Sequence, residues 1–134
     1  MEFKVNSKIL EKTLSKIIPA VPARTPMPIL ENFLFEIKGG LLVIHATDLE
    51  ISLKSSINVA ANENLSIVIP ARLIYDVIRS MEDVQINFSV DGNAKLKLTT
   101  ENGVYNISFS PSEDFPESPA ISKGKEITIS GKDL

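Results

Sequence analysis

Two groups of basic side chains are spaced so that they could contact phosphate. One group recurs every four residues and the other is seven residues apart: Lys8, Lys12 and Lys16, then Arg72 and Arg79. Side chains with this spacing share one face of an α-helix. Basic residues gathered on a helical face can bind a nucleic-acid backbone without reading bases. The alternative is that the lysines only solvate an amphipathic helix.

The overall charge of the chain opposes nucleic-acid binding unless the charges are segregated. The 134 residues carry a formal net charge of −3, and 43% of them are hydrophobic, enough for one domain with a sizeable core. An acidic protein attracts phosphate only where its basic residues are concentrated. Seven acidic residues fall in expected strands, turns and the C-terminal tail: Glu36, Glu50, Asp83, Glu101, Glu113, Asp114 and Glu117. The basic helical faces therefore remain candidates for phosphate contact.

The sequence shows no segment that would direct the chain to a membrane or out of the cell. It has no run of about 18 apolar residues, and it opens on a charged, strand-like segment rather than a signal peptide. It has no cysteine, which excludes disulfides and thiolate metal sites. These features predict a cytoplasmic protein with no membrane partner.

Residues that could support catalysis or bind a metal are sparse. His45 is the one histidine and lies in an apolar segment, so we expect a structural side chain rather than a catalytic base. Two acidic pairs could ligate a hard cation, but turn chemistry explains the first and a solvated tail the second: Asp48 with Glu50, and Glu113 with Asp114. Gly131-Lys132 lacks the serine or threonine of a phosphate-binding loop. We expect no catalytic residue, no metal and no cofactor.

The pattern of the first half predicts a strand, a helix and three more strands. Residues 2–6 alternate as a strand, and Ser7 is the expected N-cap of a helix that runs to about Ile18, where Pro19 ends it. The expected apolar face of this helix is Ile9, Leu10, Leu14, Ile17 and Ile18. A loop with four prolines follows, and then strands at 33–38, 41–47 and 49–59, the first two joined by a Gly39-Gly40 turn.

The second half repeats this order. A strand at 65–69 leads through Pro70 into a helix at 71–81, whose expected apolar face is Leu73, Ile74, Val77, Ile78 and Met81. Strands at 84–90, 94–100 and 104–109 follow, with turns at Asp91-Gly92 and Asn102-Gly103. The duplicated strand-helix-three-strand unit predicts an α+β fold with pseudo-two-fold symmetry, its two helices packed side by side on antiparallel sheet. Both basic helical faces would then point the same way.

The end of the chain repeats its beginning. Residues 126–134 align with residues 2–10, with Glu, Lys and Leu in register. A unit of about 124 residues would restart at this point. We therefore expect one domain at 1–120 and, at 121–134, a linker and the first strand of a second domain. Chance similarity between two strand-to-helix openings is the alternative.

Five short motifs follow one another from residue 1 to about residue 120. They are Glu2-Phe-Lys-Val, Pro26-Met-Pro-Ile-Leu-Glu-Asn32, Ala46-Thr-Asp-Leu-Glu50, Ile69-Pro-Ala-Arg72 and Asp114-Phe-Pro116. In this order they resemble the first domain of the bacterial β sliding clamp, the processivity subunit of DNA polymerase III. The resemblance implies the DNA clamp fold, three such domains per chain, and two chains in a homodimeric ring around double-stranded DNA, helices inside and sheets outside.

The same resemblance implies a role and assigns residues. A clamp is a non-catalytic subunit of a DNA-directed DNA polymerase, a nucleotidyltransferase, and tethers it to DNA. Arg24 in the proline loop and Arg72 match DNA-contacting basic positions of the family, and Arg79 matches a basic position lining the channel. Tyr105 and Ile107 match apolar positions of the contact between subunits, with ordinary core alternation as the alternative. The pocket for polymerase and clamp-loader peptides lies in later domains of the family, so no residue here is assigned to it.

The mechanism that the resemblance implies is topological. A closed ring holds DNA by linkage, so weak phosphate contacts are sufficient and leave the ring free to slide. A lone domain should therefore hold DNA poorly. The alternative function is a protein-binding scaffold that does not contact DNA and whose lysines only solvate the helices.

Overall fold

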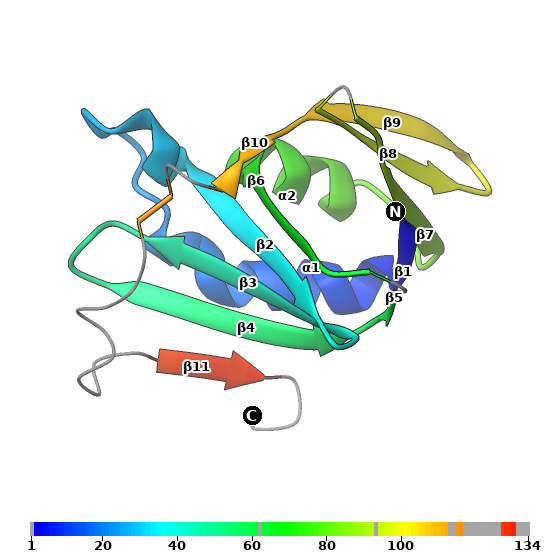
Figure 1. Cartoon of the computed structure of the whole chain (residues 1–134), viewed down its shortest axis with the longest axis horizontal. Helices are drawn as coiled ribbons and strands as arrows, with labels where there is room; N and C mark the ends of the chain where they lie inside the picture. Colours follow the sequence, from blue (N-terminus) through cyan, green and yellow to red (C-terminus); the bar gives the residue numbers. More distant parts are fainter. Residues whose placement is uncertain (1, 62, 93, 113–114, 117–126, 131–134) are drawn as a thin grey trace.

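The computed structural model describes residues 2–61, 63–92, 94–112, 115–116 and 127–130. Within these residues the chain forms α1 (Ser7–Ile17), α2 (Ala71–Arg79) and two short 3-10 helices, η1 (Ile18–Ala20) and η2 (Pro28–Glu31). The strands are β1 (Glu2–Asn6), β2 (Asn32–Lys38), β3 (Leu41–Thr47), β4 (Ser52–Asn58), β5 (Ala60–Ala61), β6 (Leu65–Pro70), β7 (Gln85–Val90), β8 (Lys95–Thr100), β9 (Gly103–Ser108), β10 (Ser110–Pro111) and β11 (Ile127–Ser130). The two α-helices pack against each other behind the strands (Figure 1). The element order confirms the predicted α+β duplication.

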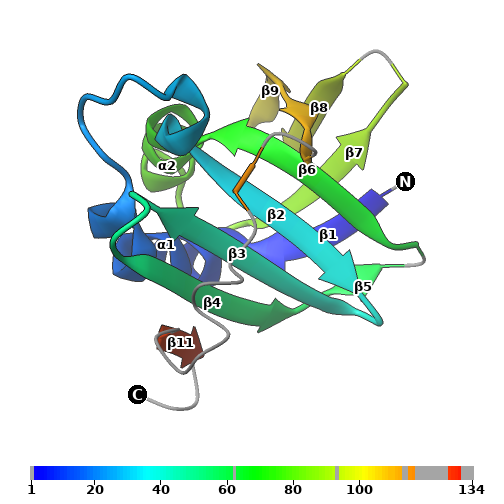
Figure 2. The same cartoon turned by 60° about the vertical axis from the view of Figure 1, so that its left-hand side comes forward.

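The strands form two sheets, and each sheet combines strands from both halves of the chain (Figure 2). One sheet has the order β5-β1-β7-β8-β9 and the other β10-β6-β2-β3-β4-β11. The two exchanges use the same register, because Asn6 at the end of β1 pairs with Gln85, and Pro70 at the end of β6 pairs with Asn32. The helices therefore pack on two sheets rather than on one continuous sheet. Each half contributes its first strand to the sheet of the other half.

One hydrophobic core fills the space between the helices and the sheets. Leu10 and Leu14 of α1 and Ile74 of α2 are fully buried within it. Phe3 of β1 stacks on Phe88 of β7 with ring centroids 4.7 Å apart, so the core also fastens an exchanged strand. Burial of one such side chain stabilises the fold by about 1.5–3 kcal/mol. The core fixes the inner faces of both helices and leaves their outer faces available for contact.

The start of α1 differs from the prediction by one residue. Asn6 caps the helix, because its Oδ1 accepts hydrogen bonds from the backbone N–H groups of Lys8 and Ile9 at 2.9 and 3.1 Å. Ser7, the predicted cap, is the first helical residue and is fully buried. Its hydroxyl donates to the carbonyl of Glu82 and accepts from the N–H of Val84. Ser7 therefore ties α1 to the segment that follows α2.

Two side chains that were predicted to be buried are exposed at equivalent places. Ile9 and Leu73 are the third residues of α1 and α2, and they are 54% and 48% exposed. The buried stripe on each helix is narrower than expected and follows its first, fourth and eighth residues. The helices also end earlier than predicted, at Ile17 and Arg79. Each helix consequently presents an exposed aliphatic side chain directly after a basic one.

The turn between β3 and β4 delays the start of the third strand from residue 49 to Ser52. Asp48 Oδ1 accepts hydrogen bonds from the N–H groups of Glu50 and Ile51, and Leu49 adopts a positive φ of 80°. The side chain of Asp48 therefore forms an Asx turn, which confirms the prediction that Asp48 has a role in the turn. The Gly39-Gly40 turn has the predicted positive φ angles, 61° and 80°. The predicted Asn102-Gly103 turn is shifted by one residue, since Gly103 already pairs with Thr100.

The last described strand, β11, lies beside β4 (Figure 1). It pairs in parallel, with Ile127 opposite Leu53. The predicted boundary between residues 120 and 121 lies outside the described residues, as do Glu113, Asp114 and Gly131-Lys132. The second domain at 121–134 therefore stays a prediction.

Candidate nucleic-acid interface

The two helices are held so that the start of α1 lies against the end of α2. The N–H of Ser7 donates to the carbonyl of Val84 at 2.8 Å, and Lys8 Nζ donates to the carbonyl of Met81 at 3.1 Å. At the opposite end, Pro70 before α2 pairs with Asn32, where the connection from α1 arrives. The two ends of the helix pair are therefore built from equivalent parts of the duplicated unit.

The connections at the two ends differ in length. Residues 80–84, five residues, join α2 to β7, whereas residues 18–31, fourteen residues, join α1 to β2. The long connection is anchored by Val21 and Leu30, which are buried, and it leads from the end of α1 through η1 and η2 to β2 (Figure 2). Arg24 stands exposed in the middle of it. The structure therefore adds a basic loop at the end where α1 finishes and α2 begins.

Two of the six predicted contact residues already have partners. Lys8 Nζ lies 3.3 Å from Glu11 Oε1, in addition to its bond to the carbonyl of Met81. Arg79 Nη2 lies 3.0 Å from Asp76 Oδ1, and its guanidinium carbon lies 5.1 Å from the centre of the Tyr75 ring. Both pairs have i,i+3 spacing along one helix. A phosphate must compete with these partners for either cation.

The other four predicted contact residues have no ion pair or side-chain hydrogen bond within the described ranges. They are Lys12, Lys16, Arg24 and Arg72. Lys16 is half-buried and the other three are exposed. Lys16 lies in the last turn of α1 and Arg72 in the first turn of α2, so these two and Arg24 belong to the end with the long connection. This end has cations free to meet a phosphate backbone.

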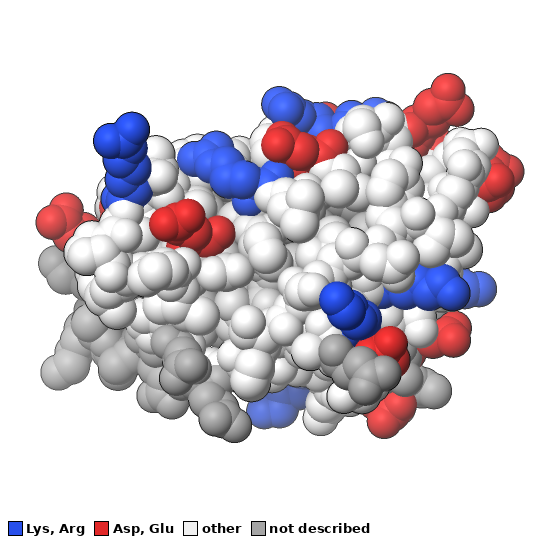
Figure 3. Space-filling view, turned by 90° about the horizontal axis from the view of Figure 1, so that it is seen from above, with Lys and Arg blue, Asp and Glu red and all other residues white. Residues whose placement is uncertain are grey.

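On the face seen from above, the charges do not form one continuous basic patch. In the view from above, positive side chains stand in separate groups, with acidic side chains near several of them, around a broad uncharged area (Figure 3). A surface of this kind attracts a polyanion through a few contacts rather than through a strong field. On this face the charges would therefore attract a phosphate backbone only weakly.

The predicted subunit contact lies on β9, an edge strand. Among the described strands β9 pairs only with β8, so one side of its backbone is unpaired. Tyr105 is 37% exposed, whereas Ile107 is 2% exposed and belongs to the core. Val104 on the other face of β9 is also exposed. The backbone edge with Tyr105 can meet another chain, while the Ile107 side chain packs inward.

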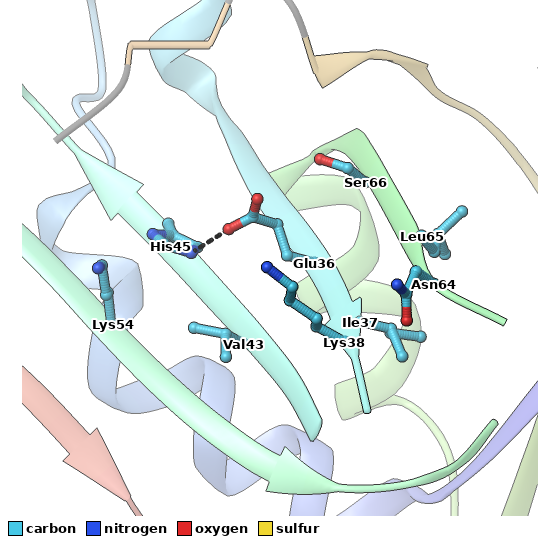
Figure 4. A pocket seen from close by; sticks show the side chains of 9 residues that line it. All are labelled: Glu36, Ile37, Lys38, Val43, His45, Lys54, Asn64, Leu65 and Ser66. Atoms are coloured by element: carbon cyan, nitrogen blue, oxygen red, sulfur yellow. Dashed lines mark ion pairs between the residues drawn. The ribbon is translucent and has the colours of Figure 1, made fainter. Parts of the chain in front are cut away.

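His45 forms a contact between strands on the outer face of the six-stranded sheet. Its Nε2 lies 2.8 Å from Glu36 Oε1, and the two side chains point toward each other (Figure 4). They lie in an open cavity of about 550 Å³ lined also by Lys38, Val43 and Ser66. The pair links β2 with β3.

Two other findings concern the described residues alone. Those residues contain no group of three or more His, Cys, Asp or Glu side chains that could hold a metal ion. They also contain no helix long and apolar enough to cross a membrane.

Sequence reasoning missed the acidic partners of the basic stripes. These partners are Glu11, which pairs with Lys8, and Asp76, which pairs with Arg79. The signal was present, because an acid three residues from a basic residue on one helix is a neighbour in space. Side-chain geometry was needed to show which cation each acid holds.

The chain matches known proteins along most of its length. A model of the DNA polymerase III beta subunit, N-terminal domain, matches residues 1–119. A beta sliding clamp of Vibrio harveyi is 28% identical over 136 residues, which cover all of this chain and 93% of that sequence. A beta sliding clamp of Buchnera aphidicola is 34% identical over 119 residues, which cover 87% of this chain and 32% of that protein.

Solved structures agree with these matches. A DnaN sliding clamp from Pseudomonas aeruginosa superposes with a TM-score of 0.81 at 31% identity, and a pol III beta from Caulobacter crescentus with 0.81 at 26%. Each match covers 87% of this chain and 32% of the other. The chain thus spans about a third of the length of these two solved relatives.

Proposed function

The chain belongs to the family of the DNA polymerase III beta subunit, N-terminal domain, and from this premise we propose that it is the first domain of a bacterial sliding clamp. Such a clamp would close around double-stranded DNA and tether the replicative polymerase during replication. The observation that carries the proposal is the end of the helix pair where Lys16, Arg24 and Arg72 have no acidic partner among the described residues.

The proposed mechanism follows from weak contacts and a closed path. Each cation that neutralises a phosphate releases counterions, so four unpaired cations would give a salt slope of about −3.6 in the logarithm of the binding constant. Contacts of this kind carry no base information. A ring held by linkage needs no tighter binding, and the weak contacts let it slide. The domain alone would bind DNA weakly.

The remaining partners and the setting are part of the same proposal. We expect two copies of the native-length protein to form a ring, with the edge of β9 and Tyr105 at the contact between subunits. The polymerase and the clamp loader would bind through domains outside this chain. The protein would act in the cytoplasm without catalysis, cofactor or metal.

The first test is a titration of the chain with a short DNA duplex at low salt, in which the amide chemical shifts of the protein report binding. Arg24→Ala and Arg72→Ala should each weaken binding and make the salt slope shallower by about 0.9. Lys97→Ala is the matched control. Lys97 is exposed on β8 of the five-stranded sheet, away from the helix pair in sequence, and its replacement changes the net charge by the same amount. Unfolding midpoints in urea verify that each variant keeps the fold.

The outcome separates the clamp from a scaffold. If Arg24→Ala and Arg72→Ala bind DNA as the unaltered chain does, or if the chain does not bind DNA, the assigned contacts are wrong and the scaffold function is favoured. If Lys97→Ala weakens DNA binding as much as these two variants do, the effect arises from the net charge of the chain, and this outcome would also count against the assigned contacts.

The proposed second domain needs its own measurement. We propose that residues 121–134 contain a linker and the first strand of another domain, which agrees with the repeat of residues 2–10 at 126–134. An immunoblot of source cells with an antibody to residues 1–120 should show a product of about 40 kDa, the mass of three repeat units. A product of about 15 kDa would refute the three-domain chain.

A further inference from the structure

The outer face of α2 carries an acid between two arginines. Arg72, Asp76 and Arg79 lie four and three residues apart, so they follow one another along the helix. Asp76 pairs with Arg79 at 3.0 Å, and the same guanidinium lies over the face of the Tyr75 ring, 5.1 Å from its centre. Within the described residues Arg72 has no such partner. Of the two arginines on this helix, Arg79 is therefore paired with a carboxylate and Arg72 is not, within the described residues.

The pair between Asp76 and Arg79 can be opened by a competing anion. The two side chains are 64% and 55% exposed, so water and salt reach both of them. Exposed ion pairs contribute little to stability, and a phosphate offers the guanidinium a stronger acceptor. Moving Arg79 to a phosphate would leave the Asp76 carboxylate facing the same backbone. Like-charge repulsion would then oppose the contact.

The surroundings of this pair are acidic. The end of α2 lies against the start of α1, where Glu11 holds Lys8 in a second i,i+3 pair. Exposed Glu82 and Asp83 lie in the short connection after α2. This end therefore has four acidic side chains and two basic ones. The opposite end has three basic residues, Lys16, Arg24 and Arg72. Its connection carries one acidic residue, Glu31 of η2, just before β2.

We propose that Asp76 is a positioning residue that withholds Arg79 from phosphate and thereby limits the DNA affinity of this face. Phosphate contact is then concentrated where α1 ends and α2 begins. The inference rests on the proposed function, because it concerns the strength of the same DNA contact. A domain with a built-in competitor for one of its cations binds a duplex less tightly and releases it more readily.

The test replaces Asp76 by its uncharged isostere. Asp76→Asn should bind a short duplex about two- to threefold more tightly at low salt, the size of one exposed ion pair. Its salt slope should steepen by up to about 0.9, because Arg79 now meets phosphate. Asp76→Glu keeps the charge and should retain the slope of the unaltered chain. Glu101→Gln is the matched control, since Glu101 is exposed in the turn between β8 and β9 and its change alters the net charge equally.

A double-mutant cycle distinguishes action through Arg79 from general electrostatics. In the Arg79→Ala background, Asp76→Asn should no longer change the salt slope. The inference is overturned if Asp76→Asn matches Glu101→Gln, or if its effect on the slope persists without Arg79. Should Arg72→Ala weaken binding while Asp76→Asn changes nothing, this inference alone fails. If the unaltered chain binds no DNA, the proposed function fails with it.

Discussion

Replacing Ser7 by Ala should destabilise the domain more than its size suggests. The Ser7 hydroxyl is fully buried, donates to the carbonyl of Glu82 and accepts from the N–H of Val84 at 3.0 Å. It therefore joins the first turn of α1 to the segment after α2, across the junction of the two halves. Alanine fits the space, because it differs from serine only by the missing hydroxyl, and the equivalent first residue of α2 is the fully buried Ala71.

The magnitude follows from the two hydrogen bonds. Each contributes about 0.5–1.5 kcal/mol net, and the buried N–H of Val84 would lose this acceptor. We expect Ser7→Ala to lower the free energy of unfolding by about 2 kcal/mol. With a urea slope of about 2 kcal/mol per molar, the unfolding midpoint should fall by about 1 M. Far-UV circular dichroism measured against urea gives this midpoint directly.

Ser15→Ala is the control for this change. The Ser15 hydroxyl donates to the carbonyl of Lys12 at 2.8 Å, but the residue is exposed on the same helix. Alanine there should alter stability by no more than about 0.5 kcal/mol, since water replaces the lost bond and alanine favours the helix. If Ser7→Ala shifts the midpoint no more than Ser15→Ala does, the reasoning that the buried hydroxyl joins the two halves is refuted.

Two further predictions concern the turn after β3 and the edge of β9. Leu49→Gly should stabilise the domain by about 0.5–1 kcal/mol and raise its melting temperature by about 2–4 °C. Leu49 is exposed and has a φ of 80°, a left-handed conformation that is unfavourable for any residue with a Cβ atom. A lower melting temperature would contradict this prediction. Tyr105→Asp should convert the proposed dimer of the native-length protein to a monomer in sedimentation velocity without changing its circular dichroism spectrum. Tyr105 is exposed on β9, which has a free edge among the described strands. A dimer that persists in this variant would exclude this edge as the subunit contact.

The element order could be predicted because periodicity and turn residues are local signals. The alternation of residues 33–38 and 41–47 and the glycine pair between them specify a hairpin without reference to the rest of the chain. The same holds for the two helices, whose buried residues recur at helical spacing. The duplication followed from comparing these local patterns.

The partners of the strands could not be predicted in this way. Alternation marks β1 as a strand, but nothing in residues 2–6 states that its partner is β7 of the other half. The predicted apolar faces of the helices were also too wide. Hydropathy places Ile9 and Leu73 in the core, but the packed helices bury only a narrower stripe that excludes both residues. Which cations are paired depends on side-chain geometry, so Lys8 and Arg79 could not be separated from Arg72 beforehand.

The two ends of the helix pair differ in how their cations are paired, and this difference arises from one connection in an otherwise symmetric fold. The second residues of the two helices, Lys8 and Arg72, are both basic and occupy equivalent places. The short connection after α2 brings the carbonyl of Met81 within reach of Lys8, at 3.1 Å. The long connection after α1 instead enters η1 and carries Arg24 outward. Arg72 makes no equivalent bond within the described residues. The longer connection both supplies one cation and leaves another without a bond of this kind, so the proposed phosphate contact falls at one end of a symmetric scaffold.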